Sequence, residues 1–297
     1  MITLTRPEGP VPEDRVVSRR ALGGLFFAGY AAAALSAAAE PIHTDDIGLV
    51  TEAVSLPAKD FALPAYVARP KTPGRFPAVI VVSEIFGVHE YIKDVCRRLA
   101  KLGYIAIAPA FFVRVADPAP LSDIQAVIKI VVQASDQQVI GDVGAAIAFL
   151  DRQPYVARGK LAITGFCWGG GTTWLACEEF PQIKAGVAWY GRMVPPATGG
   201  DPKRLWPSLR AARLKAPVLG LYGAKDSLAD TVPTMRVAMA EAHKTGNEII
   251  VYPDAGHGFH ADYRDSYNAA DARDGWARML AFFAKHGVAP RVSSALP

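Results

Sequence analysis

Cysteine is scarce in this chain: there are three in 297 residues, and they form no C-x-x-C pair. Three cysteines cannot supply a disulfide framework. The chain is instead 51% hydrophobic, which is enough to bury one large core. No internal repeat and no change of composition marks a second unit. We therefore expect residues 40–297 to form a single domain.

A run of like charges is also missing. The 32 basic and 28 acidic residues are spread along the chain and leave a net charge of +4. Proteins that bind nucleic acid usually concentrate Lys and Arg on one face, often with aromatic residues between them. No such block occurs here, so a nucleic-acid partner is not expected.

Long apolar runs are absent except at residues 21–39, which are mostly Ala, Leu, Gly and Phe. Arg19 and Arg20 precede this run, and Ala37 and Ala39 close it. This arrangement is typical of a twin-arginine export signal that is cleaved after Ala39. It predicts contact with the export machinery and a periplasmic or secreted product. An uncleaved membrane anchor and an ordinary buried helix are the alternatives, although the run is a poor permanent span.

Beyond the signal, strand-like and helix-like segments alternate. Apolar, often β-branched runs occupy residues 50–56, 61–69, 78–82, 104–108, 161–164, 185–189, 218–222 and 248–252. Helical patterns occupy residues 91–102, 121–150 (with a break near Gly141) and 270–285. Such alternation predicts an α/β fold: a mostly parallel sheet with helices on both faces. Ligands of such sheets bind at the carboxyl ends of the strands.

Cys167 lies at one of these strand ends, within the sequence Gly165-Phe-Cys-Trp-Gly169. Small residues on both sides of a nucleophile allow the sharp strand-to-helix turn that α/β-hydrolases use, usually with serine at the centre. Cys167 is therefore the candidate nucleophile. Cys96 and Cys177 fall in helix-like segments and are expected to be buried apolar residues.

Two further strand ends carry an acid and a base in the order that this fold requires. Asp226 follows the 218–222 run, and His257 follows the 248–252 run. A histidine can accept the thiol proton, and a carboxylate can orient the histidine and stabilise its charged form. His260 stands close to His257, but no further ligands accompany them, so no metal site is expected. The other four histidines are expected on the surface or at helix caps.

A second signature at the end of the 78–82 strand specifies the family. A carboxylate, Glu84, stands there beside the Gly-x-Cys-x-Gly turn, within Ser83-Glu-Ile-Phe-Gly87. The combination resembles the dienelactone hydrolase (carboxymethylenebutenolidase) family, and the similarity runs from about Pro77 to Phe283. It implies an α/β-hydrolase fold, no cofactor, and a small lactone or ester as substrate.

The resemblance also implies roles for further residues. Glu84 would hold the resting thiol and assist its deprotonation, and the backbone N–H groups of Ile85 and Trp168 would form the oxyanion hole. Arg114 would bind a substrate carboxylate, because its guanidinium matches a carboxylate bidentately. A second family arginine, four residues after the histidine, is replaced here by Ala261. Either Arg264 takes over that task through a shifted loop, or the task is lost.

The sequence thus predicts a monomeric thiol hydrolase that opens a lactone or ester by nucleophilic acyl transfer. A broad carboxylesterase or peptidase of the same fold is the first alternative. A non-catalytic binding protein and a redox-sensing thiol protein are two others, although the first has no missing triad residue to support it. No resolving cysteine lies near Cys167 in the sequence to support the second.

Overall fold

The computed structural model describes residues 2–3, 16–17, 41–198, 201 and 203–291. Most of the predicted export signal lies outside the described residues. Its described parts are β1 (Ile2–Thr3) and β2 (Val16–Val17), which pair antiparallel. Within the described part of the chain, no helix is both long and apolar enough to cross a membrane.

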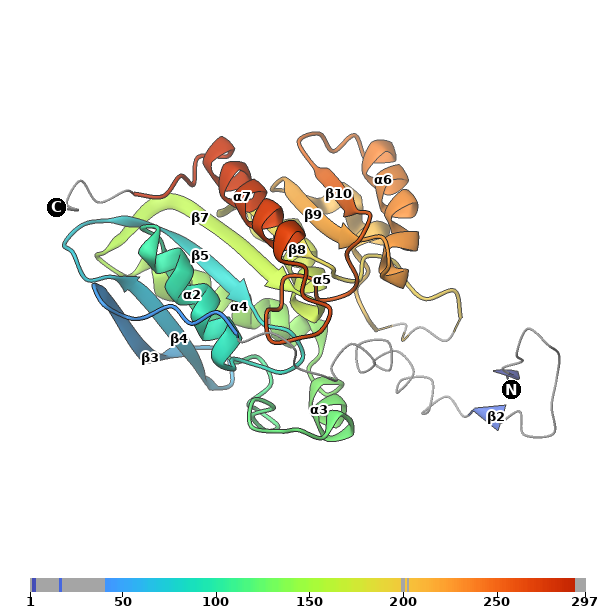
Figure 1. The fold of residues 1–297 in the computed structure, drawn as a ribbon, viewed down its shortest axis with the longest axis horizontal. Helices are drawn as coiled ribbons and strands as arrows, with labels where there is room; N and C mark the ends of the chain where they lie inside the picture. Colours follow the sequence, from blue (N-terminus) through green and yellow to red (C-terminus); the bar gives the residue numbers. More distant parts are fainter. Residues whose placement is uncertain (1, 4–15, 18–40, 199–200, 202, 292–297) are drawn as a thin grey trace.

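One large sheet forms the centre of the molecule (Figure 1). Its strands are β3 (Leu49–Pro57), β4 (Ala62–Pro70), β5 (Phe76–Val82), β6 (Ile105–Pro109), β7 (Val156–Phe166), β8 (Ile183–Trp189), β9 (Val218–Gly223) and β10 (Glu248–Tyr252). The spatial order is β10-β9-β8-β7-β5-β6-β4-β3. Neighbours are parallel from β10 to β6, and β4 runs antiparallel to both β6 and β3. The mostly parallel sheet is confirmed.

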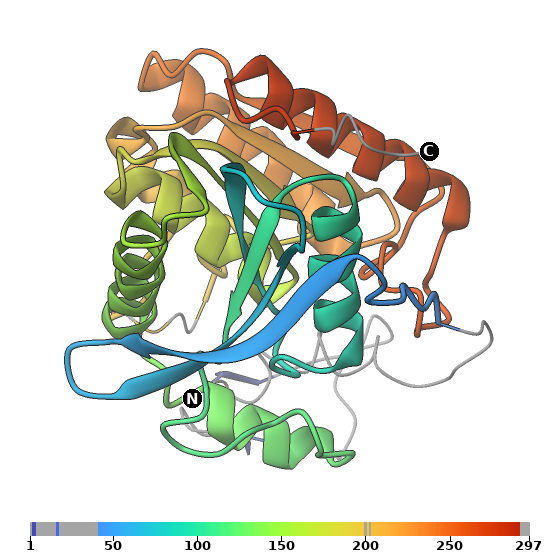
Figure 2. The same ribbon diagram turned by 90° about the vertical axis from the view of Figure 1, so that its left-hand side faces the viewer.

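Helices cover both faces of the sheet, as predicted. Helix α2 (Glu90–Lys101) packs on β4 and β6, and α7 (Ala269–Lys285) packs on β8 and β9. On the opposite face lie α4 (Asp136–Asp151) and α5 (Trp168–Glu179), the latter against β7 and β8. Figure 2 shows the two layers, with α2 in teal on one side of the strands and α4 in green on the other.

The central strands form where apolar residues follow one another without alternation. All seven residues of β5 are buried, as a strand covered on both faces requires. The strand β7 begins at Val156, before the predicted residues 161–164, and it ends at Phe166. Because β5, β7, β8 and β9 are parallel neighbours, their carboxyl ends meet at one edge of the sheet (Figure 1).

The predicted break near Gly141 is wrong. The break lies between α3 (Ile124–Val131) and α4, and Gly141 is inside α4. Side-chain caps decide the boundary: Ser135 accepts a hydrogen bond of 3.2 Å from the backbone N–H of Gln138 and so starts α4. Gly141 is tolerated within the helix at a cost of about 1 kcal/mol.

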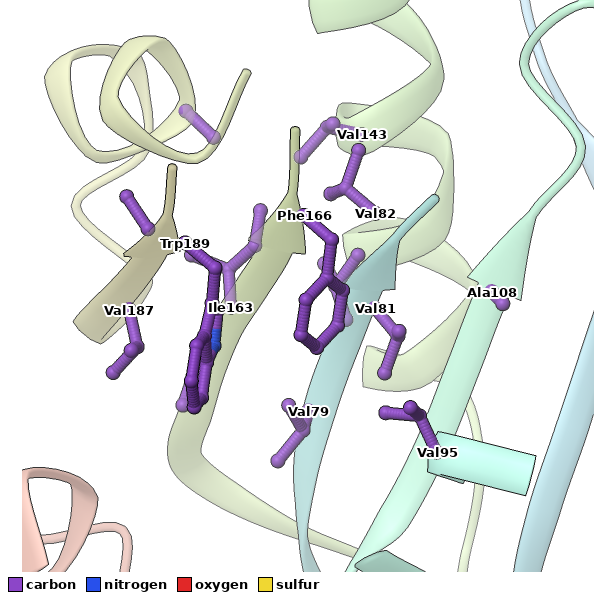
Figure 3. Packing of buried hydrophobic residues seen from close by; sticks show 14 of the residues in the cluster. Val79, Val81, Val82, Val95, Ala108, Val143, Ile163, Phe166, Val187 and Trp189 are labelled. Carbon is purple, nitrogen blue, oxygen red and sulfur yellow. The ribbon is translucent and has the colours of Figure 1, made fainter. Parts of the chain in front are cut away.

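Aromatic rings pack under the carboxyl ends of β7 and β8 (Figure 3). Phe166 and Trp189 stack with ring centroids 5.5 Å apart, next to Ile163 and Val79. Phe166 directly precedes Cys167, and Trp189 directly precedes Tyr190. The stacked rings therefore pack beneath the two turns that follow β7 and β8. Cys96 and Cys177 are fully buried in α2 and α5, which confirms their predicted place in the core.

The remaining described helices lie beside the sheet near β9. They are η1 (Pro207–Arg213), η2 (Ser227–Thr231) and α6 (Val232–Glu241). The segment between β8 and η1 was predicted to be a loop over the site, and its described residues form no helix or strand.

Candidate active site

The predicted turn at Cys167 is present between β7 and α5. Cys167 has φ 57° and ψ −116°, a strained conformation for a residue with a side chain. A Cβ atom on Gly165 would lie 2.2 Å from the carbonyl oxygen of Gly169. A Cβ on Gly169 would lie 2.4 Å from the carbonyl oxygen of Val82 in β5. Glycine is therefore required on both sides of Cys167, because the turn closes on itself and on the neighbouring strand.

The same close approach brings together the two segments that carry the predicted oxyanion donors. Gly169 packs over the carbonyl groups of Val82 and Ser83, and Glu84 and Ile85 follow directly. The backbone N–H of Trp168 hydrogen-bonds to the sulfur of Cys167 and favours its ionised form. The pairing of Ile85 with Trp168 as an oxyanion hole stays a prediction.

Asp226 and His257 meet because β9 and β10 are parallel neighbours. Oδ2 of Asp226 lies 2.6 Å from Nδ1 of His257, and both side chains are largely buried. A carboxylate can only accept a hydrogen bond, so Nδ1 carries the proton. The lone pair of Nε2 is then the basic site of the ring, which is the tautomer that a general base at a thiol needs.

Cys167 is a neutral thiol at rest. Its side chain is buried, and burial, followed by the nearby charge of Glu84, raises the pKa of the thiol well above its ordinary value. Arg264 and the N–H of Trp168 act in the opposite direction but with smaller effect. A thiol in this state resists oxidation, and it must be deprotonated at the time of reaction.

Glu84 is fully buried and is held by two side chains of the segment that follows His257. Its Oε2 accepts a 2.5 Å hydrogen bond from the Tyr263 hydroxyl, and its Oε1 lies 3.2 Å from Nη2 of Arg264. The guanidinium of Arg264 therefore faces Glu84, and its role in binding substrate stays a prediction. Its side chain is only 3% exposed, and the buried guanidinium is neutralised by Glu84.

Arg114, the other arginine predicted to bind substrate, also contacts carboxylates of the protein. Its guanidinium forms two hydrogen bonds to Asp142, of 2.7 and 2.8 Å, and two to Asp60, of 3.2 and 3.0 Å. Two carboxylates therefore already compensate the charge that was predicted to bind a substrate carboxylate. The segment before Arg114 does contact the glycine-flanked turn at Cys167 (the elbow), because Phe112 packs on Trp168 with ring centroids 4.8 Å apart.

Tyr190 is a residue of the site that the sequence did not indicate. It follows β8 with φ 38°, a second strained non-glycine residue beside the elbow. Its ring lies 5.1 Å from that of His257 in an edge-to-face contact. The hydroxyl is buried and has no hydrogen-bond partner among the residues that the structure describes. The signals in the sequence were its place at a strand end and its position within the stretch that resembles the dienelactone hydrolase family, and neither assigned it a role.

The Tyr190→Phe variant should therefore separate function from stability. Removal of an unsatisfied buried hydroxyl should leave the free energy of unfolding unchanged or raise it by up to about 1 kcal/mol. If the hydroxyl donates to the reacting substrate, kcat/KM should fall about tenfold or more. Urea unfolding and ester turnover measure the two quantities. Unchanged turnover would mean that Tyr190 only packs.

Two further histidines lie beside the site: His89, at the helix cap position that was one of the two places expected for it, is partly buried, and His260 is buried. His89 precedes α2, and its Nε2 lies 3.9 Å from Oε2 of Glu84; burial lowers its pKa to about 4. His260 has its Nδ1 2.6 Å from the hydroxyl of Tyr91, and burial lowers its pKa to about 3. Both rings are therefore neutral at pH 7. Among the described residues, no three His, Cys, Asp or Glu side chains are placed to hold a metal ion.

The buried histidines predict acid sensitivity. Well above pH 6.5 the imidazole of His260 is neutral in both the folded and the unfolded chain, so the full stability is present. Below it, only the unfolded chain binds the proton until the pH approaches about 3. This linkage should cost about 2 kcal/mol of unfolding free energy between pH 7.5 and 5.

Urea unfolding of wild type and His260→Asn at the two pH values tests this. The variant should lose less stability on acidification than the wild type does. His43→Gln, which changes a side chain that is 73% exposed, is the matched control and should behave as wild type. Equal losses in wild type and His260→Asn would contradict the prediction.

The fold and the site together define the structural class of this protein. A parallel sheet carries a potential nucleophile on a glycine-flanked turn after β7, an acid after β9 and a histidine after β10. This order of residues on this order of strands is that of an α/β-hydrolase.

Comparison with known sequences specifies the family. Residues 63–287 match the model of the dienelactone hydrolase family, and the chain belongs to this family. A Methylorubrum extorquens relative, named as a candidate carboxymethylenebutenolidase, is 48% identical over 278 residues, covering 92% of this chain and 94% of the relative. A Bradyrhizobium relative, named for 2-oxo-3-(5-oxofuran-2-ylidene)propanoate lactonase activity, is 34% identical over 75% of this chain and 89% of its own.

Solved structures agree. The crystal structure of a candidate dienelactone hydrolase from Klebsiella pneumoniae is 48% identical, with a TM-score of 0.75 over 80% of this chain and 99% of that one. A dienelactone hydrolase-like promiscuous phosphotriesterase from metagenomic libraries shares the fold at 22% identity, with a TM-score of 0.67. The chain is thus a hydrolase of dienelactone hydrolase type.

Proposed function

We propose that the protein opens a lactone or ester with Cys167 as its nucleophile. The observation that carries the proposal is the placement of an oriented Asp226–His257 pair at the sheet edge where Cys167 sits on its elbow. The hydrogen bond from Nδ1 to Asp226 leaves Nε2 as the ring nitrogen that can accept the thiol proton.

The reaction follows from these groups. The thiol proton passes to His257 or Glu84, and the sulfur of Cys167 attacks the carbonyl carbon. The developing oxyanion is met by the N–H groups of Ile85 and Trp168, each worth about 2.7–4 kcal/mol of transition-state stabilisation. The ring C–O bond then breaks, and the ring oxygen leaves as an enolate. Water activated by His257 hydrolyses the thioester, which releases the acid and restores the thiol.

The names of two relatives support a lactone as the substrate, since both carboxymethylenebutenolide and the furanylidene propanoate contain an unsaturated lactone ring. An enolate is stable enough to leave without being protonated. It therefore suits a site whose described residues assign no separate acid to the leaving oxygen. A broad carboxylesterase would need the same triad but would not distinguish enol lactones from simple esters.

A panel of enol lactones and 4-nitrophenyl esters tests the proposal. We expect lactone kcat/KM to exceed that of simple esters, with both activities lost in Cys167→Ala. Turnover of esters without lactones would favour the carboxylesterase. No turnover of either, or turnover independent of Cys167, would reject a thiol hydrolase.

We also propose that the twin arginine and the apolar run direct export of the protein before cleavage after Ala39. A thiol enzyme exported in the folded state would acquire its fold in the reducing cytoplasm. N-terminal sequencing of the protein from the native periplasm should find Glu40 as the first residue. Lysine substitution of Arg19 and Arg20 should block export. A cytoplasmic chain that still begins at Met1 would reject the proposal, and a membrane-held one would favour an anchor.

A further inference from the structure

The residues that follow the predicted signal segment run across helix α2. We call residues 41–47 the N-terminal strap, and Figure 1 shows it in blue beside α2. At Thr44 the backbone N–H donates a 2.5 Å hydrogen bond to Oδ1 of Asp94, and the carbonyl oxygen accepts one of 2.7 Å from Nε of Arg97. The two isoleucines of the strap are exposed. The strap is therefore fixed to α2 by hydrogen bonds of its backbone and not by burial of apolar side chains.

The same face of α2 holds the loop that carries the candidate base. This loop, residues 253–268, joins β10 to α7. Arg98 donates one 2.5 Å hydrogen bond to Oδ2 of Asp94 and another to Oδ2 of Asp262 in the loop. Asp94 is thus shared by the strap and by Arg98. A continuous row of contacts leads from Thr44 through Asp94 and Arg98 to Asp262.

The strap also reaches the loop directly. The backbone N–H of Ile42 lies at the carboxylate of Asp262 and favours its ionised form. Both views of the fold show the strap and the loop side by side (Figures 1 and 2). Asp262 is only 1% exposed, and a buried charge needs partners of this kind. Asp262 therefore joins the strap, α2 and the loop at one point.

From Asp262 the contacts continue into the active site. Tyr263 and Arg264 come next in the chain, and they hold Oε2 and Oε1 of Glu84 at 2.5 and 3.2 Å. Glu84 lies close enough to Cys167 for its charge to act on the thiol. The position of Asp262 therefore sets where these two side chains meet Glu84 and how closely the loop covers Cys167.

The energetics of this row of charges favour a positioning role. Buried ion pairs contribute little net stability, because the cost of desolvation offsets most of their attraction. They do demand one arrangement, since a member that moves away leaves the opposite charge buried without a partner. Asp94 and Asp262 are each 1% exposed. The row therefore fixes the loop in one place against α2.

We propose that the N-terminal strap positions the active-site loop for the reaction and that Asp262 is the positioning residue through which it acts. The inference rests on the proposed function, because the groups that it positions serve the Cys167 thiol. Loss of the strap contacts should loosen the loop and admit water to Cys167. Burial is the largest cause of the raised pKa of this thiol, so a wetter site should lower the pKa.

Thr44→Pro tests the strap by removing a single donor. Proline lacks the N–H that binds Asp94, whereas Thr44→Ala keeps it and is the matched control. Thr44→Pro should lower kcat for 4-nitrophenyl acetate about tenfold and leave KM within about twofold, since misplaced catalytic groups lower the rate steeply. Iodoacetamide should label its Cys167 at lower pH than in wild type. Thr44→Ala should match the wild type in both measurements.

Asp262→Asn tests the path by which the strap acts. It removes the charge that binds Arg98, and Asp254→Asn, at a carboxylate 83% exposed on the same loop, is its control. Asp262→Asn should reproduce the lower kcat and the shifted alkylation, and Asp254→Asn should show neither. Because both changes break one row of contacts, the double variant with Thr44→Pro should be within about twofold of Asp262→Asn alone. Urea unfolding verifies that each protein is folded under the assay conditions.

The outcomes separate this inference from the proposed function. Wild-type kcat and alkylation in Thr44→Pro, an equal effect in Thr44→Ala, or multiplied losses in the double variant would overturn the inference. Unchanged kcat in Asp262→Asn would do the same. In each case, loss of turnover in Cys167→Ala would leave the proposed function intact. Turnover that survives in Cys167→Ala would instead reject the proposed function.

Discussion

Replacement of Cys167 by alanine should abolish hydrolysis, with kcat falling by about 10⁴-fold or more. Loss of a triad nucleophile has effects of this order, because the remaining oxyanion and binding groups supply only a small part of the acceleration. Alanine leaves the elbow in place, since the turn depends on Gly165 and Gly169 and not on the sulfur. The loss should therefore appear in turnover and not in the near-UV circular dichroism of the fold.

The cysteine within α5 provides the matched control. Cys177 is equally buried, ten residues after Cys167 in the sequence, but it lies away from the triad, against Gly186. Cys177→Ala should keep its activity per folded molecule even if it loses stability. Iodoacetamide should label Cys167 slowly in the resting enzyme, because the thiol is neutral. Full activity in Cys167→Ala would overturn the proposed mechanism, and rapid labelling at pH 7 would contradict a neutral resting thiol.

Replacement of Glu84 should have the second large effect, on both stability and thiol reactivity. Glu84→Ala leaves the Arg264 guanidinium buried without its carboxylate partner, and breaking a buried pair in this way costs about 3–5 kcal/mol. It also removes the negative charge that helps to raise the pKa of the Cys167 thiol. The variant should be much less stable, and its thiol should be alkylated at lower pH than in wild type.

A second variant separates the two effects. Glu84→Leu combined with Arg264→Met replaces both charges by apolar groups and should recover most of the lost unfolding free energy. Lactone turnover should stay low in the double variant, because the carboxylate that assists deprotonation is still absent. Urea unfolding, the pH profile of alkylation and lactone kinetics measure these outcomes. Wild-type turnover in the double variant would remove Glu84 from the reaction.

The positions of the candidate catalytic groups followed from the sequence because each depends on local structure. Glycines on both sides of Cys167 permit the sharp turn, which a larger side chain would block. The apolar runs before Asp226 and His257 end at the same edge of a parallel sheet. The side-chain pattern was enough because parallel neighbours align their carboxyl ends whatever their helices do.

The helix boundaries were harder to predict from the sequence than the positions of these groups. The periodicity of residues 121–150 indicated two helices but not the break, which the caps at Asp123 and Ser135 set. Gly141 was a poor guide, since its small cost within a helix is readily offset by packing.

Partners of the charged residues were decided only by the tertiary structure. Arg264 and Glu84 are far apart in the chain, and their contact exists because the loop after β10 folds over the end of β5. The role of Arg114 was assigned through its resemblance to a family arginine, whereas its contacts with Asp60 and Asp142 come from two other segments. The same folding buries His260, partly buries His89 and turns Tyr190 towards His257. The sequence determined which groups stand at the strand ends. Which of those charges are neutralised, and which face a ligand, depends on desolvation and long-range packing that no local pattern encodes.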